Sequence, residues 1–204
     1  MLNVVSIDHQ IKVRNPADLL VSLPTVVVVN KFTEESAKVF NADMNRAFQS
    51  GQKVIPVFID SYGGEVYSLL SMIDTIRVSK VPVATIVAGK AMSCGALLFS
   101  FGTEGYRFMG PTSTLMIHDV SKGTHGKIEE IKADVGEAER LNQMVFKMMA
   151  QNCGHHDSYF LDLIHDKNHA DWYLTPSDAK DHKLCNHIRL PEMKTSVSVE
   201  THFK

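Results

Sequence analysis

Short runs of apolar residues recur along this chain, and helical segments follow them. The first run, residues 25–29, has the sequence Thr-Val-Val-Val-Val, and such a continuous β-branched stretch predicts a strand buried on both faces. Similar runs at residues 54–59, 83–88 and 113–117 predict three more strands. Because strands alternate with helices, we expect an α/β fold with a largely parallel sheet and right-handed crossovers.

Length and composition limit the classes of protein to consider. The chain has 204 residues, of which 44% are hydrophobic and 22% charged, as expected for one globular domain with a sizeable core. The formal net charge of -2 gives no basic field, so we expect no nucleic-acid partner and no binding to acidic membranes. No apolar run approaches the roughly 20 residues of a membrane span, and residues 1–20 lack the pattern of a signal peptide.

The number and spacing of the cysteines indicate the kind of cellular compartment in which the protein works. Cys94, Cys153 and Cys185 form an odd, sparse set without C-x-x-C spacing. This argues against a disulfide framework and for a reducing compartment, and we therefore expect a cytoplasmic protein.

Ser93 follows the strand predicted at residues 83–88 and begins a short helix of small and apolar residues. At a helix start its hydroxyl would be exposed, and the helix dipole would favour developing negative charge there. Serine is also a common helix cap, so Ser93 by itself does not indicate an active site. The motif is not the G-x-S-x-G turn of α/β-hydrolases, because residue 91 is alanine.

Two further features lie at predicted strand ends. His118 follows the strand at residues 113–117, and the pair Gly63-Gly64 stands between a strand and a helix of about residues 65–79. Paired glycines at a helix start expose backbone N–H groups, which suits an oxyanion site. Each feature alone has an ordinary interpretation, as a strand histidine or a turn. Together with Ser93 they lie where open α/β sheets build sites, which favours a nucleophile and its general base.

The order and spacing of these motifs resemble those of the ClpP family of ATP-dependent protease subunits. Residues 60–64 (Asp-Ser-Tyr-Gly-Gly) are similar to the family's Ser-Pro-Gly-Gly segment, although Tyr62 replaces proline. Residues 92–96 (Met-Ser-Cys-Gly-Ala) are similar to its nucleophile motif, and residues 116–118 to its Met-Ile-His motif. Residues 171–175 (Asp-Trp-Tyr-Leu-Thr) resemble the segment that supplies the triad acid.

The resemblance implies a catalytic triad of Ser93, His118 and Asp171, with the backbone N–H groups of Gly64 and Cys94 forming the oxyanion hole. The interval from His118 to the acid is a few residues longer than the family's, so Asp166 stays open as an alternative. A cysteine nucleophile at position 94 is the less favoured alternative to Ser93, because the serine fits the motif.

The resemblance also implies the fold and its extent. We expect a ClpP/crotonase-type α/β fold of repeated strand-strand-helix units with a protruding "handle" helix at about residues 127–151. One peptidase domain would occupy residues 1–204, with a divergent N-terminal segment at 1–24 and a mobile, patternless tail at 191–204.

The implied function is a serine endopeptidase that hydrolyses peptides and unfolded proteins inside a chamber. The chamber would consist of heptameric rings stacked into a tetradecamer, fed by an AAA+ unfoldase that uses ATP. The chain itself would need no cofactor and no metal. The apolar stripe of the handle helix fits a ring interface or the subunit core equally well. The stripe consists of Ile128, Ile131, Val135, Ala138, Leu141, Val145 and Met149.

Three other interpretations compete with this function. A crotonase-like acyl-CoA enzyme also uses two backbone N–H groups, but such enzymes generally use carboxylates as acid and base. A non-catalytic ring subunit stays open while the acid is unsettled. A zinc site usually needs a tighter ligand set than the histidine-rich segment offers, so we expect a solvated polar loop there. The residues concerned are Cys153, His155, His156, His165 and His169.

Overall fold

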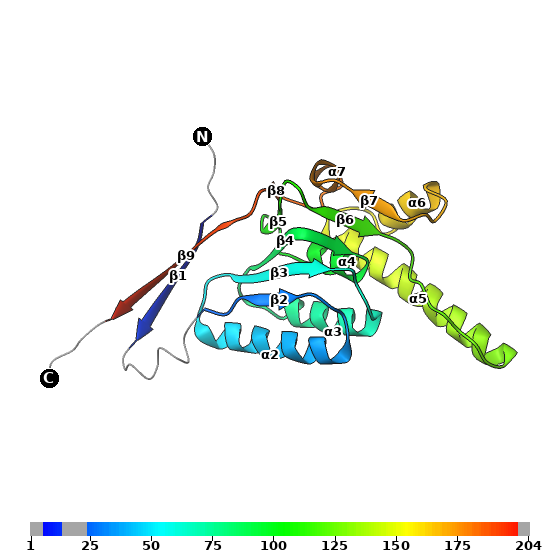
Figure 1. Ribbon diagram of the computed structural model, residues 1–204, viewed down its shortest axis with the longest axis horizontal. Helices are drawn as coiled ribbons and strands as arrows, with labels where there is room; N and C mark the ends of the chain where they lie inside the picture. The colour runs from blue at the N-terminus through cyan, green and yellow to red at the C-terminus, as the bar shows by residue number, and fades with distance from the viewer. Residues whose placement is uncertain (1–5, 14–23, 200–204) are drawn as a thin grey trace.

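A computed structural model describes residues 6–13 and 24–199 (Figure 1). The strands are β1 (Ser6–Val13), β2 (Val27–Val29), β3 (Ile55–Ser61), β4 (Val83–Met92), β5 (Arg107–Met109), β6 (Thr114–Ile117), β7 (Trp172–Leu174), β8 (His187–Ile188) and β9 (Glu192–Val199). The helices are α2 (Glu34–Ser50), α3 (Val66–Arg77), α4 (Cys94–Ser100), α5 (Ile128–Asn152), α6 (Tyr159–Asp166) and α7 (Pro176–Asp181).

The main sheet is parallel except at one strand. Its order is β2-β3-β4-β5-β8, while β6 pairs with the second half of β4, and β7 joins β6 in the antiparallel direction. Strand β4 has ten residues, enough to pair first with β5 and then with β6. The predicted α/β fold with a largely parallel sheet is therefore confirmed.

Strand β2 lies at the edge of the sheet, where it pairs with β3. Val27 and Val29 are buried, whereas the side chain between them, Val28, is 62% exposed. Helices α2 and α3 cover one face of this part of the sheet (Figure 1). The prediction of a strand buried on both faces is therefore wrong. An unbroken β-branched run predicts strand geometry but does not determine how many faces another layer will cover.

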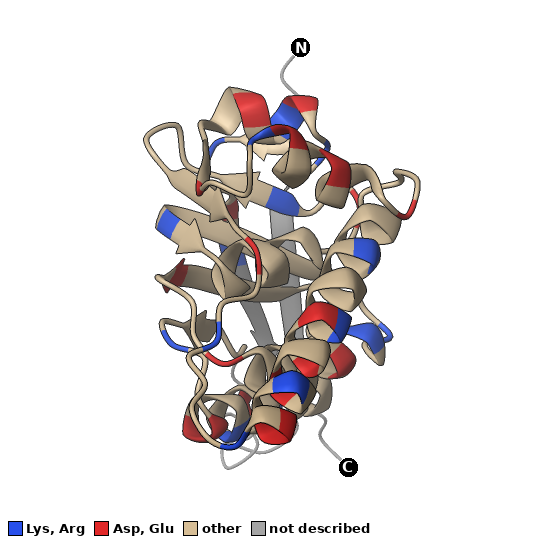
Figure 2. Ribbon diagram, turned by 90° about the vertical axis from the view of Figure 1, so that its right-hand side faces the viewer, with Lys and Arg blue, Asp and Glu red and all other residues tan. Residues whose placement is uncertain are grey.

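Helix α5 divides into two halves with different surroundings. The half from Leu141 onward packs into the core, whereas the first half leaves the body of the molecule (Figure 1). Ile128 is 72% exposed and Val135 is also exposed, and charged residues of both signs lie along the same helix (Figure 2). The apolar stripe is therefore buried in the core from Leu141 onward, whereas before Leu141 its residues are half-buried or exposed. The buried members of the stripe are Leu141, Val145 and Met149, and the neighbouring Phe146 and Ala150 of the same helix are buried with them.

A buried arginine fastens the C-terminal part of the chain to the sheet. Arg107 of β5 has no exposed surface, and its guanidinium donates to the carbonyl oxygens of Gly102 at 3.3 Å and Lys183 at 3.0 Å. It also pairs with the carboxylate of Glu104, which lies at the surface. A buried charge is tolerated where hydrogen bonds replace its hydration, as they do here at the two terminal nitrogens, although Nε has no partner among the described residues.

The histidine-rich segment is more ordered than its composition indicates. Residues 159–166 form helix α6, whose Phe160 and Ile164 are buried. The prediction of a solvated polar loop in this segment is therefore wrong. Polar residues dominate the sequence there, but apolar side chains four residues apart give the helix a face that packs against the core.

Strands β1 and β9 form a separate two-stranded parallel pair, with Ser6 opposite Glu192 and Val13 opposite Val199. Residues 192–199 of the predicted tail thus have a pairing partner that no sequence pattern indicated. Residues 200–204 of the tail, and residues 1–5 and 14–23 of the N-terminal segment, lie outside the described residues. Among the helices that the structure describes, none has the length and apolar character to cross a membrane.

Candidate active site

Ser93 occupies a tight turn between β4 and α4. Its backbone has φ 54° and ψ -121°, which is unusual for a residue other than glycine. Its N–H donates to the carbonyl oxygen of Met116 at 2.8 Å, and its own carbonyl accepts from Leu97 at 3.1 Å. Within the described residues its hydroxyl does not cap α4, so the helix-cap interpretation has no support. Strained turns of this kind persist where the surrounding structure holds them, and they cluster at functional sites.

The Gly63-Gly64 loop packs directly against this serine. A Cβ placed at residue 63 would lie 2.7 Å from Cβ and 3.2 Å from Oγ of Ser93. At residue 64 a Cβ would lie 2.4 Å from the carbonyl oxygen of Phe32. Both glycines also have positive φ, 105° and 151°. Glycine is therefore required at residue 63 by the close approach to Ser93 and at residue 64 by the close approach to the backbone of Phe32.

His118 lies on the strand end next to Ser93. The parallel register of β4 and β6 places Met92 opposite Met116, so the chain on each strand reaches the same edge of the sheet. His118 follows β6 directly, and its side chain is 23% exposed. The structure thus brings the two predicted residues onto adjacent strand ends.

Asp171 lies beside His118 because of the next strand pairing. The antiparallel register of β6 and β7 places Ile117 opposite Trp172, so His118 and Asp171 are the next residues to face each other. The Nδ1 atom of His118 is 3.9 Å from Oδ1 of Asp171. That distance allows an ion pair but exceeds a normal hydrogen bond. Asp166, the alternative acid, lies at the C-terminal end of α6.

Cys94 is buried directly after the serine. Its Sγ lies 3.2 Å from the carbonyl oxygen of Gly64, to which the thiol donates, so it links α4 to the glycine loop. Burial raises the pKa of the Cys94 thiol to about 11. Only the thiolate is an effective nucleophile, so this environment argues against a cysteine nucleophile at position 94.

The segment that follows His118 lines two cavities. The larger, of about 540 Å³, is bounded by Gly64, Val66, Val120 and Leu141 among others and has a mostly apolar lining. It therefore reaches the glycine loop and offers space for an apolar side chain beside it.

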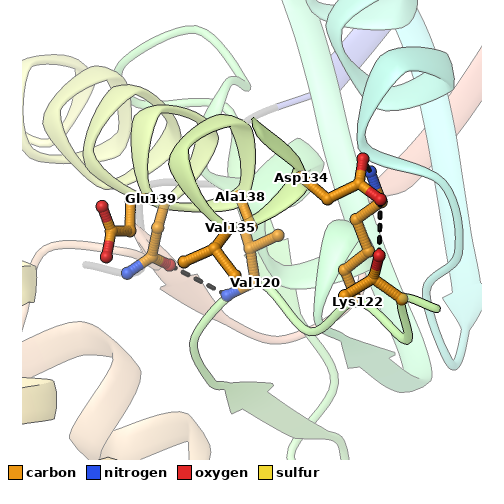
Figure 3. A pocket seen from close by; sticks show the side chains of 8 residues that line it. Val120, Lys122, Asp134, Val135, Ala138 and Glu139 are labelled. Atoms are coloured by element: carbon orange, nitrogen blue, oxygen red, sulfur yellow. Dashed lines mark hydrogen bonds and ion pairs between the residues drawn. The ribbon is translucent and has the colours of Figure 1, made fainter. Parts of the chain in front are cut away.

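The smaller cavity, of about 200 Å³, lies between the same segment and the first half of α5. Figure 3 shows Val120 and Lys122 facing Val135, Ala138 and Asp134 of the helix. Lys122 donates to Asp134 at 2.5 Å, and the hydrogen bonds from Lys122 and Thr124 lower the pKa of the Asp134 carboxyl. These contacts hold the segment against the exposed half of the helix.

Sequence reasoning missed a polar network immediately beyond His118. Oδ1 of Asp119 accepts a hydrogen bond from Nδ2 of Asn142 at 2.7 Å, and Oδ2 of Asp119 lies 2.7 Å from Nδ1 of His169. The Oδ1 atom of Asn142 accepts from the backbone N–H of Val120 at 2.9 Å. The histidine-rich segment was visible in the sequence, but its contact with Asp119 depends on the tertiary structure.

The histidine-rich segment forms no metal centre in the described structure. Over residues 6–13 and 24–199, no three His, Cys, Asp or Glu side chains are grouped so that they could hold an ion. The histidines of this segment instead make hydrogen bonds and ring contacts, such as the stacking of His155 on Tyr159 with centroids 3.8 Å apart.

These features define the class of protein. It is an α/β protein in which a serine, a histidine and a glycine loop lie together at the ends of its strands. The family model described as Clp protease matches residues 9–191, which is most of the chain. The chain therefore belongs to the Clp protease family, and its mixed α/β sheet agrees with the fold of that family. Family membership makes it a peptidase of the ClpP type, which confirms the resemblance seen in the sequence motifs.

Proposed function

We propose that this chain is a serine endopeptidase in which Ser93 is the nucleophile, His118 the general base and Asp171 the acid that orients the imidazole. One observation carries the proposal: the registers of β4, β6 and β7 set these three residues on adjacent strand ends. The strained turn at Ser93 and its contact with Gly63 add support, because both restrict the position of the hydroxyl.

The reaction would proceed through an acyl-enzyme. His118 takes the proton of the Ser93 hydroxyl as Oγ attacks the carbonyl carbon of the peptide bond. His118 then gives this proton to the leaving amine as the C–N bond breaks. A water molecule, deprotonated by His118, attacks the ester, and the proton returns to Ser93 as the new carboxylate leaves.

Asp171 would fix the tautomer of His118 and stabilise its protonated form. The present separation of 3.9 Å must shorten by about 1 Å for a hydrogen bond to form. Catalytic hydrogen bonds are often long without substrate and tighten when substrate binds, so this distance is compatible with the role.

The oxyanion of the tetrahedral intermediate would be held by the backbone N–H groups of Gly64 and Cys94. One such donor typically contributes about 2.7–4 kcal/mol of transition-state stabilisation. The hydrogen bond from the Cys94 thiol to the Gly64 carbonyl supports this assignment, because it ties together the two segments that carry the donors.

We further propose that the peptidase works as a chamber of heptameric rings stacked into a tetradecamer. The exposed apolar residues Ile128 and Val135 on the protruding half of α5, and Val26 and Val28 near the sheet edge, support burial by neighbouring subunits. Substrates would be peptides, and unfolded proteins supplied by an AAA+ unfoldase that uses ATP. The chain itself would need no cofactor, metal, nucleic acid or membrane.

A cytoplasmic location belongs to the same proposal. The three cysteines are free and buried, as expected where thiols stay reduced. Burial raises the pKa of Cys153 to about 11 and raises that of Cys185 as well, so these thiols resist oxidation.

The test combines a fluorophosphonate probe with native mass measurement on the wild type and Ser93→Ala. We expect the probe to label only the wild type, and both proteins to have the same native mass, several times that of one chain. Equal labelling of both would refute the nucleophile. A complete lack of labelling in the wild type would favour a crotonase-like enzyme or a non-catalytic ring subunit, and a native mass of one chain would refute the chamber.

A further inference from the structure

The contact between His118 and Asp171 has little local support from the strands that carry it. Strands β6 and β7 share three residue pairs, and the last of them, Ile117 with Trp172, comes just before the two active-site residues. Their separation of 3.9 Å is too long for a hydrogen bond of their own. Contacts beyond the end of the ladder can therefore influence how closely they approach.

The next contact outward is the one between Asp119 and His169. Asp119 follows His118 directly, and His169 stands two residues before Asp171. Their side chains meet at 2.7 Å between Oδ2 and Nδ1. This pair thus bridges the same two segments as the active-site pair, with a contact of hydrogen-bond length.

Both members of the bridge are anchored elsewhere. The second carboxylate oxygen of Asp119 accepts from Asn142 on the half of α5 that packs into the core. The backbone N–H of His169 donates at 3.0 Å to the carbonyl oxygen of the buried Ile164 in α6. The bridge therefore connects the segments on either side of the active site to two packed helices.

The backbone conformation before and at His169 indicates that the surrounding structure holds this residue in place. Asn168 and His169 have φ of 54° and 59°, two successive left-handed conformations in residues that carry a side chain. L-residues adopt this conformation rarely and only where the surroundings hold it. This left-handed turn brings the chain back from the end of α6 toward Asp119.

We propose that Asp119 and His169 are positioning residues that set the approach of Asp171 to His118. The proposal rests on the proposed function, because it assigns these residues a task in the same triad. Neither residue touches the reacting atoms. The bridge acts by holding the segment after the base against the segment before the acid.

A surface ion pair without this task would behave differently. The His169 side chain is 58% exposed, and exposed ion pairs contribute little to stability, so removing the pair should barely change the melting temperature. Catalysis is more sensitive, since a displacement of about 1 Å in a catalytic group can cost on the order of 100-fold in rate. A large fall in kcat without a fall in stability therefore separates positioning from a merely structural contact.

The experiment measures kcat and KM on a short fluorogenic peptide for full-length wild type, His169→Ala, His169→Asn and Ser93→Ala. We expect His169→Ala to lower kcat by about 10- to 100-fold and to change KM by less than about 2-fold. The side-chain amide of His169→Asn can donate from nearly the position of Nδ1, so it should keep kcat within about 3-fold of wild type. The matched control is His156→Ala, an exposed histidine of the same segment that bonds Ser158, and it should leave kcat unchanged.

A double variant tests whether the two residues act together. The double variant Asp119→Asn/His169→Ala should reduce kcat no further than Asp119→Asn or His169→Ala alone, whichever is more impaired. The effects of changing two residues of one interacting pair are not additive. Wild-type kcat in His169→Ala, equal loss in His169→Asn, or a loss confined to KM would each overturn the positioning role alone. No Ser93-dependent cleavage in the wild type would overturn the proposed function and this inference together.

Discussion

The backbone N–H of Ser93 donates to the carbonyl oxygen of Met116 at 2.8 Å, which joins the turn at Ser93 to the strand that leads into His118. The bond belongs to the main chain, so it does not depend on the hydroxyl of Ser93 or on the side chain of Met116. The relative position of the two residues is thus set by sheet register, and the side chains can be tested separately from the fold.

Replacing Ser93 with alanine should therefore remove catalysis and leave the fold intact. We expect peptidase activity to fall by about 10⁵- to 10⁶-fold, as when the nucleophile of other serine peptidases is removed. The melting temperature should stay within about 2 °C of wild type, since the strained φ of 54° is equally unfavourable for both residues. Activity assays beside thermal unfolding check both, and substantial residual cleavage would contradict the assignment.

Gly63→Ala tests the close contact between the glycine loop and Ser93, the proposed nucleophile. The added Cβ would lie 2.7 Å from Cβ of Ser93, so the serine or the loop must move, and the residue would keep an unfavourable φ of 105°. We expect probe labelling to fall by at least about 10-fold and stability to fall by about 1–3 kcal/mol.

The matched control is Gly136→Ala in the exposed half of α5, where a Cβ meets nothing within 4 Å. That change should stabilise the protein by up to about 1 kcal/mol, because alanine is the better helix former, and should leave labelling unchanged. Equal effects of the two changes on labelling would show that the contact between residue 63 and Ser93 does not matter for labelling.

Local sequence patterns predicted the elements that carry the site, because their signals are local. The periodicity of α5 and the glycine pair before α3 each depend on neighbouring residues. Strand β5, with three residues, is too short to show a pattern, and the β1–β9 pair joins segments far apart in the chain. The contact between Asp119 and His169 could not be predicted either, because it depends on a left-handed turn that non-glycine residues rarely adopt.

Cys94→Ala distinguishes a supporting thiol from a nucleophile. Its raised pKa of about 11 leaves almost no thiolate at neutral pH, so catalysis should not depend on the sulfur. Losing the hydrogen bond to the Gly64 carbonyl and the buried sulfur should reduce kcat/KM by only about 3- to 10-fold. Iodoacetamide should also fail to inactivate the native wild type at pH 7.5. Loss of activity on the scale of Ser93→Ala would instead identify Cys94 as the nucleophile.

His182 should make the protein less stable in mild acid. Burial, followed by repulsion from His155, lowers the pKa of His182 below its ordinary value of 6.5. Its Nδ1 lies 2.8 Å from the hydroxyl of Tyr159, and its ring meets Trp172 at 4.8 Å between centroids. The other charged groups that affect it are Asp178, Asp181 and Lys167.

The direction in which stability changes with pH follows from how many protons the folded and unfolded states bind. Below pH 6.5 the unfolded chain protonates His182 while the folded protein resists it, so stability is full above this pH and is lost as the pH falls toward the lowered pKa. Urea unfolding should thus give a lower stability at pH 5.5 than at pH 7.5, with a smaller difference in His182→Gln. Glu137 does not affect this comparison. Hydrogen bonds from Arg140 and Tyr67 lower the pKa of its carboxyl to about 2, so the stability that Glu137 contributes is lost only below about pH 4.5. An unchanged pH dependence in His182→Gln would exclude this histidine as the cause.

The two halves of α5 should respond oppositely to substitution. Leu141 is buried in the core, so Leu141→Ala should cost about 2–5 kcal/mol of stability in urea unfolding. Ile128 and Val135 are exposed on the protruding half, so replacing both with glutamate should barely change the unfolding of the subunit. The same pair of charges should lower the native mass, because a ring interface over these residues would have to bury them unpaired. A native mass equal to that of wild type would show that this half of the helix is not an interface between subunits.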